Sequence, residues 1–138
     1  MNSVNFFKIS KVPEIIENTI FSELADILDP EDESLIAIYP WKDGDIMFTF
    51  LSDQKVKSLV ILFEAHAVLE KFKNVTESIL MAREKGKEFK TVFENTDYTK
   101  LLNKFLKENL TVDLILDKIT EYGIESINEI DKEIMKNY

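Results

Sequence analysis

Only three prolines and three glycines interrupt this chain of 138 residues, and these few breaks place most of its elements. Pro13 suits the first position of a helix, because the N–H that proline lacks would have no partner there. Asp29-Pro30 suits the end of the same helix, since a residue before proline avoids the α conformation. Apolar residues recur at helical spacing in between. We therefore predict an N-terminal helix over residues 13–28.

A β-hairpin is predicted next, from two short strands of β-branched and aromatic residues at 35–39 and 46–51. The loop between them contains Asp43-Gly44, a dipeptide that type I′ turns prefer because both of their central residues take a positive φ. Both faces of these strands are largely apolar, so we expect the hairpin to be covered on both sides.

The segment from residue 52 to residue 85 allows two interpretations. Residues 56–63 are rich in Val, Leu and Ile and suit a third strand. A helix accounts for more of the segment, because Ser52 can serve as its N-cap and no Gly or Pro separates Phe63 from the helical spacing that follows. We favour one long central helix that starts near residue 55 and that Gly86 ends.

The last third is predicted to be helical, with Thr96 and Thr111 as N-caps and Gly123 at the left-handed position where a helix ends. The sequence thus predicts an α+β, mainly helical fold: an N-terminal helix, one antiparallel β-hairpin, a long central helix and a C-terminal helical hairpin. We assign residues 1–110 to a single globular domain and residues 111–138 to the helical hairpin, packed on that domain.

The segment from Ile115 to Ile134 carries Leu-Asp-Lys-Ile, then Gly123, then Ser-Ile and an acidic-rich end. With its flanks, over residues 112–138, it resembles a short helical-hairpin tail at the C-terminus of several bacterial proteins, including some rhomboid-family intramembrane proteases. The resemblance implies a bacterial or phage origin and a small accessory packing unit. It does not extend to protease activity, since the chain has no Gly-x-Ser-x-Gly sequence and no membrane span.

The excess negative charge of the chain is confined to residues 12–54, which hold eleven acids and one base and therefore carry a net charge of −10. The rest of the chain has 15 acids and 16 bases, or +1, which gives the total of −9. This asymmetry indicates one acidic surface rather than a diffuse solubilising charge.

Cysteine is absent, which excludes disulfides, thiolate catalysis and thiolate metal sites. The N-terminus lacks the charged and apolar regions of a signal peptide. The longest apolar run, Leu59 to Phe63, is far shorter than the roughly 20 residues of a membrane span. We expect a cytoplasmic protein, or a virion-associated one if a phage encodes it, without a membrane partner.

No catalytic, cofactor or metal site is predicted. The acidic loop at 29–33 lacks the alternating ligands, central Gly and distal Glu of a calcium loop. His66 is the only histidine, and without a second His or a Cys it is a poor zinc anchor, so we interpret it as a boundary or core residue. Three isolated glycines cannot form a phosphate cradle. The net charge argues against nucleic-acid binding in spite of the basic segment at 83–90.

Three functions follow from these features. The first is a small, acidic, non-enzymatic protein-binding module, a subunit or adaptor in a larger bacterial or phage assembly, whose protein partner has a basic surface. The second is an inhibitor of immunity-protein or DNA-mimic type that uses the acidic face of residues 12–54. The third is a small enzyme that uses carboxylates.

We favour the protein-binding module. Trp41 is expected at the hairpin tip, and Trp is frequent in interface hot spots; the alternative is that the tip folds back and buries it. The predicted partner-binding residues lie at the tip and in the acidic loop: Trp41, Asp43 and Asp45, then Glu31, Asp32 and Glu33.

Overall fold

The computed structural model describes residues 2–81, 96–127 and 129–136 of the chain, in an α+β fold. The chain divides into two compact units, Met1–Val75 and Thr76–Tyr138, each of which is described by itself. The domain boundary predicted from the sequence lies after residue 110.

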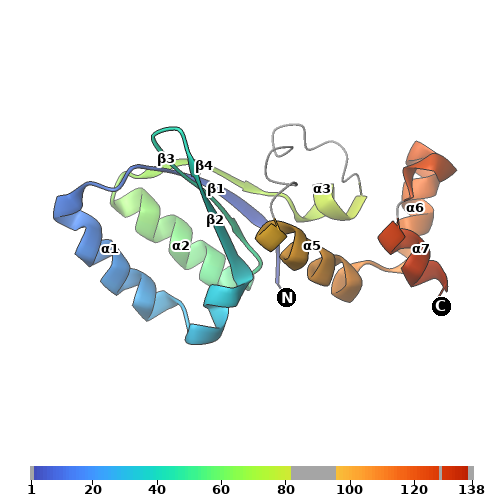
Figure 1. Ribbon diagram of the computed structural model, residues 1–138, viewed down its shortest axis with the longest axis horizontal. Coiled ribbons are helices and arrows are strands. Elements are labelled where there is room, and N and C mark those ends of the chain that lie inside the picture. Colours follow the sequence, from blue (N-terminus) through green and yellow to red (C-terminus); the bar gives the residue numbers. More distant parts are fainter. Residues whose placement is uncertain (1, 82–95, 128, 137–138) are drawn as a thin grey trace. The chain divides into compact units, whose positions relative to one another are not determined.

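The N-terminal unit contains four strands, two α-helices and one 3₁₀-helix. In chain order they are β1 (Asn5–Ser10), α1 (Glu14–Ile27), η1 (Pro30–Leu35), β2 (Ile36–Trp41), β3 (Gly44–Thr49), α2 (Asp53–Ala65) and β4 (Leu69–Asn74). The strands form one antiparallel sheet in the order β2-β3-β1-β4, so β2 and β4 are its edges (Figure 1). This order of elements is that of the ferredoxin-like βαββαβ motif, a topology that hosts many unrelated functions.

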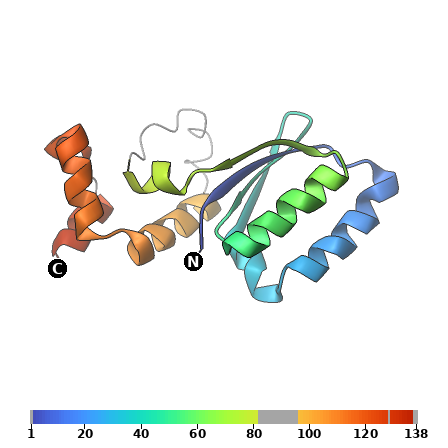
Figure 2. The ribbon, with the colours of Figure 1, turned by 180° about the vertical axis from the view of Figure 1, so that it is seen from behind.

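Helices α1 and α2 lie together on one face of this sheet, as both ribbon views show (Figures 1 and 2). The core between helices and sheet centres on Phe7, whose ring lies 6.0 Å from that of Phe63 on α2 and 5.0 Å from that of Phe72 on β4. On the other face of the sheet, the rings of Phe6 and Phe48 lie 5.3 Å apart, and both side chains are buried. Both faces of β3 are therefore buried. The expectation that the whole hairpin is covered on both sides is met by β3 only, because Ile38 on β2 is exposed.

The N-terminal helix and the hairpin are confirmed, but the predicted reason for Gly44 is wrong. In the turn between β2 and β3, Lys42 has a φ of 51°, whereas Asp43 and Gly44 do not have a positive φ. Positive φ at the first central residue alone is the φ pattern of a type II′ turn, not of type I′. Gly44 begins β3 instead, where a Cβ would lie 2.0 Å from the carbonyl oxygen of Ile9. The glycine is required by the close approach of β1.

The predicted long central helix is wrong beyond residue 65. Residues 56–63 are helical, and Ser52 caps α2 by accepting a hydrogen bond from the Lys55 N–H. The helix ends at Ala65 because Ala67 takes a left-handed conformation, with a φ of 57°, without being a glycine. The chain then forms β4, which pairs with β1. Strand β1 itself was not predicted, and the proposed stop at Gly86 lies outside the described residues.

The C-terminal unit is helical over its described residues. It contains α3 (Thr76–Met81), α5 (Thr96–Asn109), α6 (Val112–Tyr122), the 3₁₀-helix η4 (Ile124–Ser126) and α7 (Glu129–Lys136). Thr111 caps α6 by accepting a hydrogen bond from the Leu114 N–H at 3.2 Å. Gly123 ends the helix with a φ of 90°. Helices α6 and α7 form the predicted C-terminal helical hairpin.

Candidate functional site

The predicted partner-binding residues lie at the two ends of one strand, β2. Glu31, Asp32 and Glu33 are in η1, which leads directly into the start of β2. Trp41 ends the strand, and Asp43 and Asp45 follow in the turn and in β3. Six residues of extended chain span roughly 17 Å, so the two groups do not converge on one point. They mark the limits of an elongated surface.

Asp32 has a structural role in this surface. Asp29 and Asp32 form a capping box at the start of η1, in which the Asp29 N–H donates to the Asp32 carboxylate at 2.8 Å. The Lys55 ammonium, on α2, donates to Asp32 and also to Asp29 at 3.0 Å. These contacts leave the Asp32 residue only 7% exposed. They fasten η1 to the first turn of α2.

The ion pair shifts the pKa of both partners. The hydrogen bond from Lys55 holds the pKa of Asp32 below its ordinary value, against the opposing effect of partial burial. The hydrogen bonds to Asp32 and Asp29 raise the pKa of Lys55 above its ordinary value. An ionised Asp32 at neutral pH is unsuited to act as a general acid.

Glu31 and Glu33 are the residues of η1 whose carboxylates remain available. Both are exposed, and neither takes part in an ion pair with any residue that the structure describes. A hydrogen bond within η1 involves the backbone of Glu31 rather than its carboxylate: the Ser34 hydroxyl donates to the Glu31 carbonyl at 2.8 Å. This end of β2 therefore presents two free negative charges.

The hairpin tip is held in place but stays open to solvent. The Lys11 N–H donates to the Asp43 carbonyl at 2.8 Å, which ties the turn to the chain beyond β1. Trp41 is half-buried, and the Lys42 ammonium lies 5.9 Å from the centre of its ring, a cation–π distance. Asp43 is exposed and Asp45 is half-buried. The tip thus combines an aromatic ring with two carboxylates.

Between these ends, β2 presents apolar side chains. Ile38, at the middle of the strand, is 57% exposed even though it is a large hydrophobic residue. Sequence reasoning missed Ile38, because the alternation of the hairpin gave no sign that this strand would be an edge. The prolines and acidic residues near β2 could have indicated an edge strand, because edge strands tolerate proline and often have charged residues beside them.

Other polar groups offer less chemistry. His66 Nε2 lies 3.0 Å from a carboxylate oxygen of Glu23, so the histidine joins α2 to α1 at their shared boundary. Within the described ranges, no group of His, Cys, Asp and Glu side chains is arranged to hold a metal ion. No helix among the same residues is both long and apolar enough to cross a bilayer.

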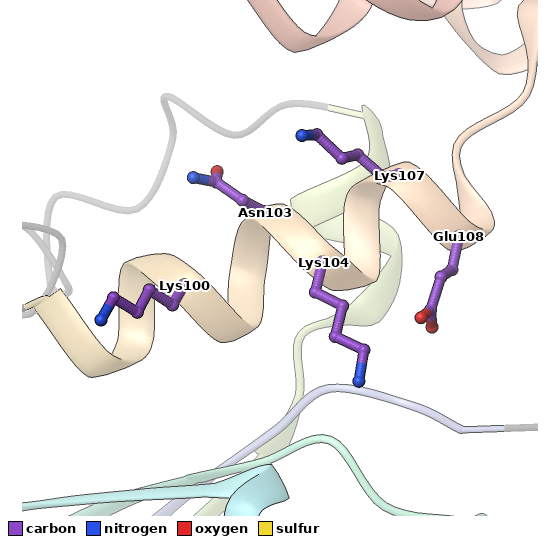
Figure 3. Close-up of a pocket in the computed structure, with 5 residues that line it drawn as sticks. All are labelled: Lys100, Asn103, Lys104, Lys107 and Glu108. Atoms are coloured by element: carbon purple, nitrogen blue, oxygen red, sulfur yellow. The ribbon is translucent and has the colours of Figure 1, made fainter.

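The C-terminal unit has an open hollow of about 480 Å³ along α5 (Figure 3). Five exposed residues line it, and their side chains leave the helix in different directions: Lys100, Asn103, Lys104, Lys107 and Glu108. Divergent ammonium groups do not form a site for one anion. We assign no activity to this hollow.

Comparison of the chain with protein-family models, with curated proteins and with solved structures finds no match. The geometry of β2 and its acidic ends therefore carries the functional argument.

Proposed function

We propose that the chain is a small, acidic, non-enzymatic protein-binding module, which acts in the cytoplasm or in a virion as a subunit or adaptor of a larger bacterial or phage assembly. It binds a basic surface of a protein partner along β2. The observation that supports this most strongly is the exposed Ile38 at the middle of the strand, with carboxylates at both of its ends that form no ion pair with any residue the structure describes.

This arrangement has the usual anatomy of a protein interface. Such interfaces combine an apolar, often aromatic centre with a polar and charged rim. On β2 the apolar centre is Ile38, whereas the half-buried Trp41 lies at the end of the strand and points to the opposite face of the sheet. The rim consists of Glu31 and Glu33 at one end and Asp43 and Asp45 at the other. A basic partner would be steered to these carboxylates before the apolar contact forms, which raises the association rate more than the affinity.

An inhibitor or DNA-mimic function is the second candidate, because exposed acids continue along α1. Glu14, Glu17 and Asp26 are exposed, and none of them forms an ion pair with another described residue. A target that binds an extended negative surface would contact these side chains as well as the carboxylates at the ends of β2. The two proposals therefore differ in which carboxylates the partner needs.

Affinity purification of the tagged chain from its host, followed by mass spectrometry, distinguishes them with two matched variants. The rim variant neutralises four carboxylates at the ends of β2: Glu31→Gln, Glu33→Gln, Asp43→Asn and Asp45→Asn. The control variant makes the same change in charge on the helices: Glu14→Gln, Glu17→Gln, Asp26→Asn and Glu64→Gln. Asp32 is left intact in both, because it holds Lys55.

We expect a stoichiometric partner that the wild type and the control variant retain and that the rim variant loses. Loss of the partner in the control variant as well as in the rim variant would extend the binding surface to α1 and support the inhibitor. Absence of a stoichiometric partner at both low and moderate salt would contradict the proposed function.

A further inference from the structure

The two edges of the sheet differ in how well they are protected against another strand. Edge strand β4 carries Glu70, Lys71 and Lys73, and its pairing with β1 contains a register shift between Lys8 and Ile9. Charged residues and β-bulges are the usual devices that prevent an edge from pairing further. Edge strand β2 reads Ile-Ala-Ile-Tyr-Pro-Trp and has no charged residue. Of the two edges, β2 is the less protected, because the only such device that it carries is Pro40, near the end of the strand.

The hydrogen-bond pattern identifies the backbone groups that β2 presents outward. The Phe50 N–H donates to the Leu35 carbonyl at 2.9 Å, and bonded positions alternate along an antiparallel pair. Ala37 and Tyr39 therefore point their backbone groups to β3, whereas Ile36, Ile38 and Pro40 point theirs away from the sheet. Proline stands at an outward position, where the N–H that it lacks is not needed.

An incoming strand would find five backbone groups and one apolar side chain. The groups are the N–H and C=O of Ile36 and Ile38 and the C=O of Pro40. Ile38 is opposite Met47, which is opposite Phe7, so its side chain lies on the sheet face that carries α1 and α2. An apolar residue of the added strand would pack against Ile38 on that face.

The charges at the ends of β2 determine which strand can be added. In an antiparallel pair of two copies, Glu31 and Glu33 of one copy would face Asp43 and Asp45 of the other. In a parallel pair, each acidic end would face its own equivalent. Like charges meet in both strand orientations, and this repulsion disfavours pairing with a second copy of the chain. A segment with Lys or Arg at both ends meets opposite charges instead.

We propose that β2 accepts an additional β-strand from the protein partner, an extended segment with apolar residues at its centre and basic residues roughly 17 Å apart at its ends. This inference rests on the proposed function and specifies how the partner is held. Backbone hydrogen bonds to Ile36, Ile38 and Pro40 supply the pairing, and the carboxylates at the two ends select the charge of the segment.

Amide hydrogen exchange, measured by NMR on the full chain, tests this with a synthetic peptide, Lys-Lys-Val-Thr-Val-Thr-Val-Lys-Lys. We expect the saturating peptide to slow exchange of the Ile36 and Ile38 amides by at least about tenfold, because each gains a hydrogen bond. The Ala37 amide, already bonded to β3, should change little. The same peptide with methylated valine nitrogens keeps its charge but loses the donors, and it should leave all three amides unchanged.

Two variants form a matched pair for the same peptide. Ile38→Lys places a cation at the centre of β2 and is expected to weaken binding about tenfold or more, through lost apolar contact and charge repulsion. Ile61→Lys changes an isoleucine of similar exposure, 61%, on α2 and should leave the affinity unchanged. Circular dichroism of both variants verifies that they are folded.

Equal affinity of the two variants, binding without protection of Ile36 and Ile38, or no binding at millimolar peptide would each overturn strand addition. The proposed function fails separately. A purified partner that requires the rim carboxylates but leaves the Ile36 and Ile38 amides exchanging as in the free chain would support the protein-binding function and refute the added strand.

Discussion

Replacement of Gly44 by alanine is expected to destabilise the N-terminal unit strongly. An ideal Cβ on Gly44 would lie 2.0 Å from the Ile9 carbonyl oxygen and 3.0 Å from the Cα of Ser10. The nearest of these distances must grow by about 1 Å, so β1 and β3 would have to separate at this pair. Such overpacking costs about 1–3 kcal/mol, and each ladder hydrogen bond lost adds about 1 kcal/mol. We expect the free energy of unfolding to fall by about 3 kcal/mol.

A second substitution separates this explanation from the one based on the turn. Gly44→Asn would be tolerated if the position required a positive φ, because Asn enters the left-handed region more easily than other residues. Gly44 does not have a positive φ, and the obstacle is the backbone of β1. We therefore expect Gly44→Asn to be at least as damaging as Gly44→Ala.

Urea unfolding followed by Trp41 fluorescence is the suitable assay. Trp41 is the only tryptophan of the chain and pairs with Gly44 across the hairpin, so its emission reports on this unit. Wild-type stability of the asparagine variant, with a destabilised alanine variant, would refute the close-approach argument. Wild-type stability of both variants would refute the register of β1 against β3.

Two further predictions concern the ion pairs. The folded-state pKa of Asp32 lies below its ordinary value of 3.8, so its ionised form stabilises the fold above that pH, and the contribution is lost as the pH falls through the folded pKa. We expect Asp32→Asn to reduce stability at neutral pH and to flatten the acid end of a thermal-unfolding pH profile; an unchanged profile would contradict this. In the C-terminal unit, Lys118 and Asp131 are 4% and 0% exposed and lie 2.8 Å apart. Lys118→Met should cost about 3–5 kcal/mol in urea unfolding by removing the Lys118 ammonium from a buried carboxylate, whereas Lys118→Met with Asp131→Leu should recover most of that loss. Equal stability of the single and double variants would rule out this pairing.

The elements that the sequence predicted correctly are those with local signals. Proline limits α1, a serine N-cap starts α2, and Thr111 and Gly123 bound α6. Each of these signals lies within a few residues of the boundary that it sets. Local periodicity and capping were therefore sufficient for these helices and for the hairpin.

The errors arose where pairing between distant segments decides the structure. Strand β4 reads Leu-Glu-Lys-Phe-Lys-Asn, a composition that suits a helix, and it is extended because it pairs with β1 some 60 residues earlier. The break before it occurs at Ala67, a residue type that gives no sign of a left-handed conformation. Strand β1 lies between β3 and β4, and no local pattern reveals a central strand of that kind.

The candidate site was predictable in its charges but not in its arrangement. The acidic residues at 31–33 and at 43 and 45 are visible in the sequence, whereas the edge position of β2 depends on the strand order of the whole sheet. The structural role of Asp32 depends on Lys55, which is 23 residues away in the chain. Only the fold shows that Asp32 holds η1 in place while its neighbours Glu31 and Glu33 remain free.

Amide hydrogen exchange of the complex between the chain and its purified partner is the most direct test of the central claim. We predict slower exchange over residues 30–45, with Ile36 and Ile38 affected most and the amides of β4 unchanged. Protection confined to α1, or to the C-terminal unit, with β2 exchanging as in the free chain would contradict the claim that the partner binds along β2.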